Sequence, residues 1–235
     1  TKALLKSANV FEYLTHAADY GIEVKDANAN FGAMIERSRG VASGMSAGIQ
    51  FLMKKNKIDV IKGFGSVKAN KTVSVKAEDG TVTEYTANKG VIIATGARSR
   101  NLPNLPQDGS KIIGYREAMT LPTQPKKLVV VGSGAIGVEF AYFYNAIGTE
   151  VTIVEYMPNI VPIEDEDVSK QLEKSFKKSG IKVMTNSSVE KVDTSGAGCV
   201  VTVKMAKGEE TLECDVVLSA VGIEANIENI GLEEV

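Results

Sequence analysis

The stretch Leu128-Val129-Val130-Val131-Gly132-Ser133-Gly134-Ala135-Ile136-Gly137-Val138-Glu139 decides the fold class of this chain. A β-branched apolar run comes first, a glycine-rich turn follows, and the residues after the turn favour a helix. In a G-x-G-x-x-G turn, Gly132 permits the tight bend, Gly134 lets the backbone approach a pyrophosphate, and Gly137 lets helix and strand pack closely. The stretch therefore predicts a strand–turn–helix unit whose helix N-terminal amides face the diphosphate of a dinucleotide.

A carboxylate follows the next predicted strand. That strand covers residues 151–154, and Glu155 comes directly after it, eighteen residues beyond Gly137. A carboxylate at this place accepts hydrogen bonds from both hydroxyls of the adenosine ribose and repels a 2′-phosphate, so the sequence predicts NAD rather than NADP. The alternative is a glycine-rich turn that binds no ligand, and the strand and helix on either side of the turn disfavour it.

Strands and helices alternate around this unit. The pattern predicts strands at 128–131, 150–154 and 181–184, helices at 135–147 and 166–179, closely spaced strands at 188–193, 199–205 and 209–213, and a last apolar strand within 215–221. Strand–helix alternation implies a parallel sheet, and the closely spaced strands imply an antiparallel β-meander beside it. The predicted fold class is therefore α/β, with a Rossmann-like domain that contains a parallel sheet and an antiparallel meander.

The first half of the chain has a different organisation. It predicts helices to about residue 20 and over 27–56, strand-like pieces at 58–65, 72–76 and 81–87, and a short buried strand over 90–96 that ends in a glycine. Residues 102–110 and 121–125 are rich in Pro, Gly, Asn and Asp, which disfavour regular structure. Basic residues exceed acidic ones before these breaks and acidic residues predominate after them, so we place the main domain boundary near residue 121.

Composition narrows the possible function classes. The 235 residues include 27 basic and 29 acidic side chains, for a net charge of −2, which argues against binding nucleic acid through bulk positive charge. No run of eighteen apolar residues is present, so no membrane association is expected. Two cysteines are too few for a disulfide scaffold and indicate a reducing compartment. The single histidine, His16, disfavours a histidine metal site or a catalytic triad, and no metal is predicted.

Taken together, four stretches resemble the two-dinucleotide flavoprotein disulfide reductases, and among them most closely the dihydrolipoamide dehydrogenase branch. Residues 1–5 look like the segment after the family's redox-active cysteine pair, and residues 92–97 look like its second flavin motif. Residues 130–140, together with Glu155, look like its NAD-binding core. Residues 161–170 resemble the lipoamide branch in particular. The resemblance covers essentially the whole chain.

The resemblance implies roles for individual residues. Lys2 and Glu139 would form a pair beside the flavin ring, where a lysine stabilises negative charge on reduced flavin. The residues implied in contacts with FAD are Lys2, Gly65, Thr95, Gly96 and Ala97. The residues implied in binding NAD are Gly132, Ser133, Gly134, Ala135, Ile136, Gly137, Val138, Glu139, Glu155, Val189 and Gly222.

The same resemblance implies a function for the complete protein. Residues 1–120 would be a partial FAD-binding domain with its linker, and residues 121–235 an NAD-binding domain whose last residues lead back to the FAD domain. The complete protein would oxidise dihydrolipoyl groups in an FAD-dependent reaction that reduces NAD. Its expected partners are the lipoyl domains of 2-oxo-acid dehydrogenase complexes and a second copy of itself. The cytoplasm, or the mitochondrial matrix in a eukaryote, is the expected compartment.

Parts of the family pattern are not found in this sequence. The family uses two cysteines five positions apart, whereas Cys199 and Cys214 are fifteen apart, lie in predicted strands and are expected to be buried core thiols. We therefore expect a central fragment without the redox cysteine pair and the C-terminal dimerisation domain, able to bind NAD but inactive by itself. The alternatives are a stand-alone NAD-binding module without catalysis, and another branch of the family such as a glutathione or mercuric reductase.

Overall fold

The computed structural model describes residues 1–235 apart from the side chain of Glu234. Its contacts divide the chain into two units. Unit 1 contains Thr1–Ala42 and Ser99–Gly222, and unit 2 contains Ser43–Arg98 and Ile223–Val235. The predicted domains, an FAD-binding part up to residue 120 and an NAD-binding part from residue 121, are defined by the cofactor that each would bind. The two units are defined by contacts within the chain, so the predicted division stays a prediction.

A parallel sheet forms the centre of unit 1. Its strands lie in the order β5-β12-β6-β7-β8 and comprise β5 (Ile112–Ile113), β12 (Val216–Ser219), β6 (Lys127–Val131), β7 (Glu150–Val154) and β8 (Lys182–Met184). Strands of such a sheet are buried on both faces, which requires nearly continuous apolar runs. In β6, all four residues from Leu128 to Val131 are buried.

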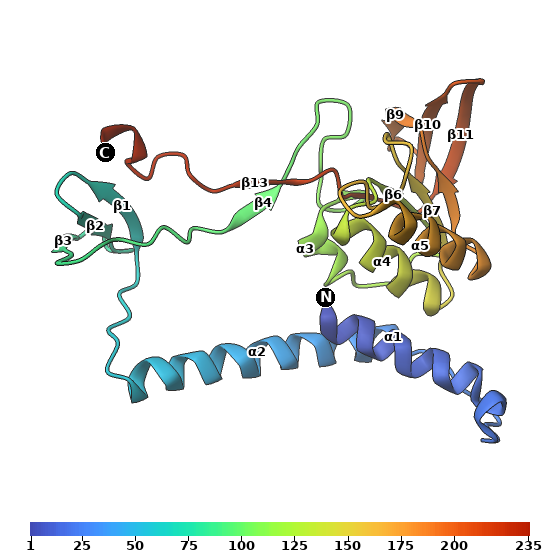
Figure 1. Ribbon diagram of the computed structural model, residues 1–235, viewed down its shortest axis with the longest axis horizontal. Coiled ribbons are helices and arrows are strands. Elements are labelled where there is room, and N and C mark those ends of the chain that lie inside the picture. Colours follow the sequence, from blue (N-terminus) through green and yellow to red (C-terminus); the bar gives the residue numbers. More distant parts are fainter. The chain divides into compact units, whose positions relative to one another are not determined.

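Helices cover one face of this sheet and a second sheet covers the other (Figure 1). The helices are α1 (Lys2–Thr15), α3 (Tyr115–Ala118), α4 (Ala135–Ala146) and α5 (Glu166–Lys178). The second sheet is antiparallel, in the order β11-β10-β9, with strands β9 (Ser188–Asp193), β10 (Cys199–Met205) and β11 (Gly208–Cys214). Val130 packs in the core beneath the helices and its neighbour Val129 in the core against the antiparallel strands, as side-chain alternation requires. The predicted α/β class, with a parallel sheet and a β-meander, is confirmed.

Helix α2 (Phe31–Lys55) also follows the helical spacing predicted for it. Its first residue, Phe31, is buried against Phe143 and Tyr144 of α4. Along its second half Met45, Ile49 and Phe51 are more than half exposed. A short 3₁₀ helix (Ala17–Tyr20) lies between α1 and α2.

Unit 2 is built mainly from an antiparallel sheet of β1 (Phe64–Lys68), β2 (Thr72–Lys76) and β3 (Val82–Thr86). The turn between β2 and β3 contains Asp79 and Gly80; Gly80 has φ +86°, and the Asp79 carboxylate accepts a hydrogen bond from the Thr81 amide. Strand β13 (Ile223–Ala225) pairs with β4 (Ala97–Ser99), and the chain ends in a 3₁₀ helix, Leu232–Glu234.

Two expectations for the first half of the chain are wrong. Residues 91–96 do not form a strand, and Ile92 is 93% exposed, although their apolar sequence predicted a buried strand. A strand needs a hydrogen-bonding neighbour, and within the part of the chain that the structure describes none pairs with this segment. The strand expected over 58–65 begins only at Phe64. Among the described residues, no helix combines the length and apolar composition needed to cross a membrane.

Candidate dinucleotide-binding site

The turn after β6 is closely packed at two of its three glycines. Gly132 has φ +94°, and a Cβ atom there would lie 2.5 Å from the carbonyl oxygen of Ala220. A Cβ atom on Gly137 would lie 2.1 Å from the carbonyl oxygen of Gly132. Because backbone atoms make these contacts, a side chain at either position would push α4 or β12 away from the turn.

The middle glycine has open space in front of it. Gly134 is the N-cap of α4, and nothing lies within 4 Å of the place where its Cβ would stand. The first intrahelical hydrogen bond runs from the Val138 amide to the Gly134 carbonyl at 3.1 Å. The amides of the three residues between them therefore lie in the first turn, where the helix itself offers no acceptor. This open cradle of amides has the geometry and the partial positive charge that a diphosphate requires.

Glu155 is held against this turn by three hydrogen bonds. The residue directly follows β7 and is only 6% exposed. Its Oε2 accepts hydrogen bonds from the Ser133 amide at 2.8 Å and from the Ser133 hydroxyl at 2.5 Å, while Oε1 accepts from the Met157 amide at 2.7 Å. These three donors fix the carboxylate beside the glycine turn and compensate for its burial.

The structure brings Lys2 and Glu139 together. The Lys2 ammonium at the start of α1 donates a hydrogen bond to the carboxylate of Glu139 on α4. The Lys2 side chain is 83% exposed and that of Glu139 is 27% exposed, so the pair lies at the surface of unit 1. Water screens such a pair, and its contribution to stability is small.

The remaining residues expected to bind NAD follow β12 or lie in β9. Gly222 comes after β12 with φ +112°, and its carbonyl oxygen accepts a hydrogen bond from the Arg100 amide at 3.0 Å. Val189 is on β9, buried in the core between the two sheets, and its carbonyl oxygen accepts from the Asn104 side-chain amide at 2.6 Å. The side chain of Val189 is thus a packing residue in this conformation.

Sequence reasoning passed over Ser219. It is the last residue of β12, it pairs in register with Val131 directly before the glycine turn, and it is 3% exposed. Its hydroxyl oxygen is buried and has no hydrogen-bond partner among the described residues. A buried hydroxyl without a partner is unusual, and this one lies at the carboxyl edge of the sheet, where ligands of such folds bind. The signal in the sequence was a single polar residue inside an apolar run.

The residues expected to contact FAD include four in unit 2. Gly65 lies in β1, Thr95 and Gly96 lie in the irregular segment before β4, and all three are exposed, while Ala97 in β4 is half-buried. The carbonyl oxygens of Thr95 and Gly96 accept hydrogen bonds from Asn226. Because three of these four residues are exposed, unit 2 by itself does not enclose a flavin.

An open parallel sheet, a glycine turn leading into a helix and a carboxylate after the next strand define a dinucleotide-binding protein. The family model described as pyridine nucleotide-disulphide oxidoreductase matches residues 1–235, and the chain belongs to this family. The resemblance seen in the sequence is thereby confirmed.

Similar proteins carry more specific names. The chain is 42% identical over 235 residues to a dihydrolipoyl dehydrogenase of Zymomonas mobilis and 40% identical over 239 residues to one of Mycobacterium leprae, covering all of this chain and 50% of each relative. It also resembles the crystal structure of LpdA from Mycobacterium tuberculosis, with a TM-score of 0.88 and 30% identity, over 100% of this chain and 50% of that one. The chain thus spans about half the length of these relatives.

Proposed function

We propose that this chain is a central part of a dihydrolipoyl dehydrogenase, with a partial FAD-binding domain over residues 1–120 and the NAD-binding domain over residues 121–235. The complete protein would oxidise dihydrolipoyl groups with FAD as its flavin and NAD as electron acceptor. Membership of the family and the names of the relatives support this proposal. The expected partners are lipoyl domains of 2-oxo-acid dehydrogenase complexes and a second copy of the complete protein. A bacterial cytoplasm agrees with the two free cysteines and with the bacterial origin of the relatives.

The observation that carries the proposal is the buried carboxylate of Glu155 against the glycine turn. NAD, when bound, accepts a hydride at its nicotinamide ring. For its part, the chain would hold the diphosphate on the first-turn amides of α4, above Gly134. Glu155 would accept hydrogen bonds from the adenosine ribose hydroxyls, and its charge would repel a 2′-phosphate. Lys2 and Glu139 would stand at the flavin end of the site, as the family resemblance implies.

Replacing Glu155 tests this assignment. Glu155→Arg removes the ribose acceptor and supplies a cation for a 2′-phosphate, so we expect NAD binding to weaken by about tenfold or more and NADP binding to strengthen. Dissociation constants from isothermal titration calorimetry with both dinucleotides measure the change. Glu155→Gln keeps the shape and removes the charge, and it should lose selectivity without inverting it.

The matched control is Glu209→Arg, which makes the same charge change at an exposed residue of β11. It should leave both dissociation constants within about twofold of those of the unchanged chain. Circular dichroism melting of each variant separates lost binding from lost folding. The role of Glu155 as acceptor of the ribose hydroxyls would be refuted if Glu155→Arg folds and binds NAD and NADP with the same affinities as the unchanged chain.

The stand-alone NAD-binding module without catalysis is a second candidate. Cys199 and Cys214 lie in β10 and β11 as buried free thiols, not as a pair five positions apart. The two candidates differ in turnover: production of NADH from NAD and dihydrolipoamide by the protein that contains this chain supports the dehydrogenase, and NAD binding without turnover supports the module. Glutathione and mercuric reductase branches would require NADP preference, which Glu155 disfavours.

A further inference from the structure

Cys199 and Cys214 face each other across two neighbouring strands. They are direct register partners, one at the start of β10 and one at the end of β11. Direct partners in an antiparallel pair have Cα atoms about 4.5–5.5 Å apart, whichever type of pair they form. A disulfide spans Cα separations of about 4.4–6.8 Å, so the backbone already holds these cysteines within bridging distance. Partner side chains also lie on the same face of the sheet, here the face that packs in the core between the two sheets.

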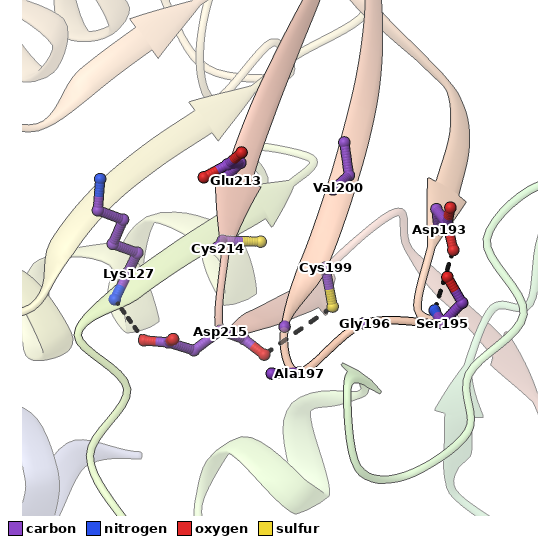
Figure 2. A pocket seen from close by; sticks show the side chains of 11 residues that line it. Lys127, Asp193, Ser195, Gly196, Ala197, Cys199, Val200, Glu213, Cys214 and Asp215 are labelled. Atoms are coloured by element: carbon purple, nitrogen blue, oxygen red, sulfur yellow. Dashed lines mark hydrogen bonds between the residues drawn. The ribbon is translucent and has the colours of Figure 1, made fainter.

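A pocket adjoins this pair of thiols (Figure 2). Its volume is about 430 Å³, and small residues of the loop before β10, Gly196, Ala197 and Gly198, line it together with both cysteines. Lys127 and Asp215 also line it (Figure 2). Lys127 begins β6 and Asp215 precedes β12, so the pocket lies at the amino ends of the parallel strands, whereas the glycine turn follows their carboxyl ends. The pocket is therefore separate from the dinucleotide site.

We propose that Cys199 and Cys214 form a dithiol site that small-molecule disulfides, such as oxidised glutathione, convert to a cross-strand disulfide. In the first step a cysteine thiolate attacks one sulfur of the small disulfide, which forms a mixed disulfide and releases one small thiol. In the second step the other cysteine attacks the protein sulfur of the mixed disulfide and releases the second small thiol. Two protein thiols are oxidised and one small disulfide is reduced to two thiols, so atoms and electrons balance.

The charges around the two thiols indicate which one attacks first. Burial raises the pKa of Cys214 to about 12. Burial also raises the pKa of Cys199, where the neighbouring Lys111 ammonium opposes the increase and the carboxylates of Asp108 and Asp215 add to it. The Lys111 ammonium is held there by the carbonyl oxygens of Thr194 and Gly196. Both thiols border the pocket, but the Lys111 ammonium favours the thiolate of Cys199 over that of Cys214, so Cys199 is the attacking residue. Its thiolate fraction is small at neutral pH, and the exchange is therefore slow.

The dithiol site does not depend on the proposed enzymatic function, because none of its residues belongs to the dinucleotide site. A bridge between β10 and β11 would close a loop over the hairpin and fix the antiparallel sheet that covers one face of the parallel sheet. The bridge would thus make the stability of unit 1 depend on the thiol–disulfide balance around the protein.

Equilibration of the whole chain in glutathione redox buffers tests the proposal. Intact mass should fall by two hydrogen atoms, and peptide mapping should find the Cys199 and Cys214 peptides joined. We expect the equilibrium constant for bridge formation to be at least about tenfold higher in the native chain than in the same chain unfolded in urea, which corresponds to a reduction potential about 30 mV more negative. Equilibrium is approached from the reduced chain and from chain oxidised with diamide, so that slow exchange is not mistaken for absence of the bridge.

Two single variants are the matched controls. Cys214→Ser should stop at the mixed disulfide and gain one glutathione on Cys199, whereas Cys199→Ser should remain largely unmodified. The proposal is overturned if the native chain keeps two free thiols in buffers that oxidise the unfolded chain. It is equally overturned if the unchanged chain accumulates glutathione on Cys199 without forming the bridge.

Discussion

Gly134 and Gly137 after β6 have different surroundings. Because of this difference, we expect a substitution at one to affect mainly stability and a substitution at the other to affect mainly NAD binding. A Cβ atom at Gly137 would collide with the Gly132 carbonyl, whereas a Cβ atom at Gly134 would stand in open space. We expect Gly137→Ala to lower the free energy of unfolding by about 1–3 kcal/mol. Gly134→Ala should cost less than about 1 kcal/mol, because Gly134 has φ −66° and alanine is only a poorer N-cap.

Gly134→Ala, the variant with the smaller expected loss of stability, should show a large loss of NAD affinity. The methyl group of Gly134→Ala would stand where the diphosphate approaches, so this variant should lose about tenfold or more in NAD affinity while it remains folded. Urea denaturation and calorimetric titration on both variants measure the two effects. Equal NAD affinity in Gly134→Ala and the unchanged chain would show that no diphosphate binds at this turn.

Ser133 positions Glu155 and is expected to affect both stability and selectivity. Its fully buried hydroxyl donates to the Glu155 carboxylate at 2.5 Å. Hydrogen bonds to charged groups contribute about 1.5–3 kcal/mol, so Ser133→Ala should lower the free energy of unfolding by roughly that amount. Ser195→Ala, at an exposed serine, is the control and should stay within about 0.5 kcal/mol. Urea titrations of both variants measure these values, and a neutral Ser133→Ala would mean that the amides of Ser133 and Met157 hold the carboxylate without the hydroxyl.

Spacing along the sequence predicted the place of Glu155 after the second strand but not its hydrogen bonds with Ser133. A carboxylate after the second strand follows from strand and helix lengths, which a pattern of apolar residues reveals. The hydrogen bond from Ser133 depends on how the turn after β6 lies against the end of β7, and this contact between separate elements has no local signature. Ser219 escaped for the same reason, since its burial without a partner arises only when β12 lies beside β6.

At the scale of elements, an ion-pair cluster ties β4 to β13. The Arg98 guanidinium donates to the carboxylate of Glu224 at 3.1 Å and to that of Glu228 at 2.8 Å. The hydrogen bond from Arg98 to Glu228 lowers the pKa of Glu228 from its usual 4.5 to about 2. A lowered pKa in the folded chain means that the pair stabilises the strands above pH 4.5 and that this stabilisation is lost as pH falls toward 2. The cluster is exposed, so its contribution is screened by salt.

Arg98→Gln tests this cluster. Without the guanidinium, the pKa of Glu228 should return to the usual range of a glutamate, which carboxyl chemical shifts in an NMR pH titration report directly. Asp79 provides an internal control, because hydrogen bonds from Thr81, not from an arginine, lower its pKa. The Asp79 titration should be the same in both proteins. An unchanged Glu228 titration in the variant would contradict the role of Arg98.

The elements also show where sequence patterns succeed and fail. Residues 188–193 and 199–205 are strands with the predicted bounds, and in β10 the alternate residues Cys199, Val201 and Val203 face the buried side. Strand β5 was missed, since Ile112 and Ile113 are too few to show a period and become a strand only by pairing with Val217 and Leu218. Residues 91–96 fail in the opposite way: their apolar composition favours a buried strand, but no strand of the described chain lies beside them.

At the scale of the whole molecule, buried apolar side chains are unequally divided between the two units. Among the described residues, Ile230 is the only buried hydrophobic residue of unit 2, whereas unit 1 contains both core clusters. Burial of apolar surface is the main source of stability. We therefore expect unit 2 to open at a lower free energy than unit 1, so that a single two-state transition does not describe unfolding of the chain.

Hydrogen–deuterium exchange of the intact chain, followed by mass spectrometry, tests whether unit 2 opens at a lower free energy than unit 1. Amides of β6, β7 and α4 should exchange last, because they hydrogen-bond within the buried core of unit 1. The segments at 57–63 and 87–96 should exchange first and should also be the first sites of limited proteolysis, since they lie outside regular strands and Ile92 is 93% exposed. NAD should slow exchange further around the glycine turn, while the antiparallel sheet β1-β2-β3 serves as a reference within the same sample. Uniformly slow exchange across both units would contradict the unequal division of the core.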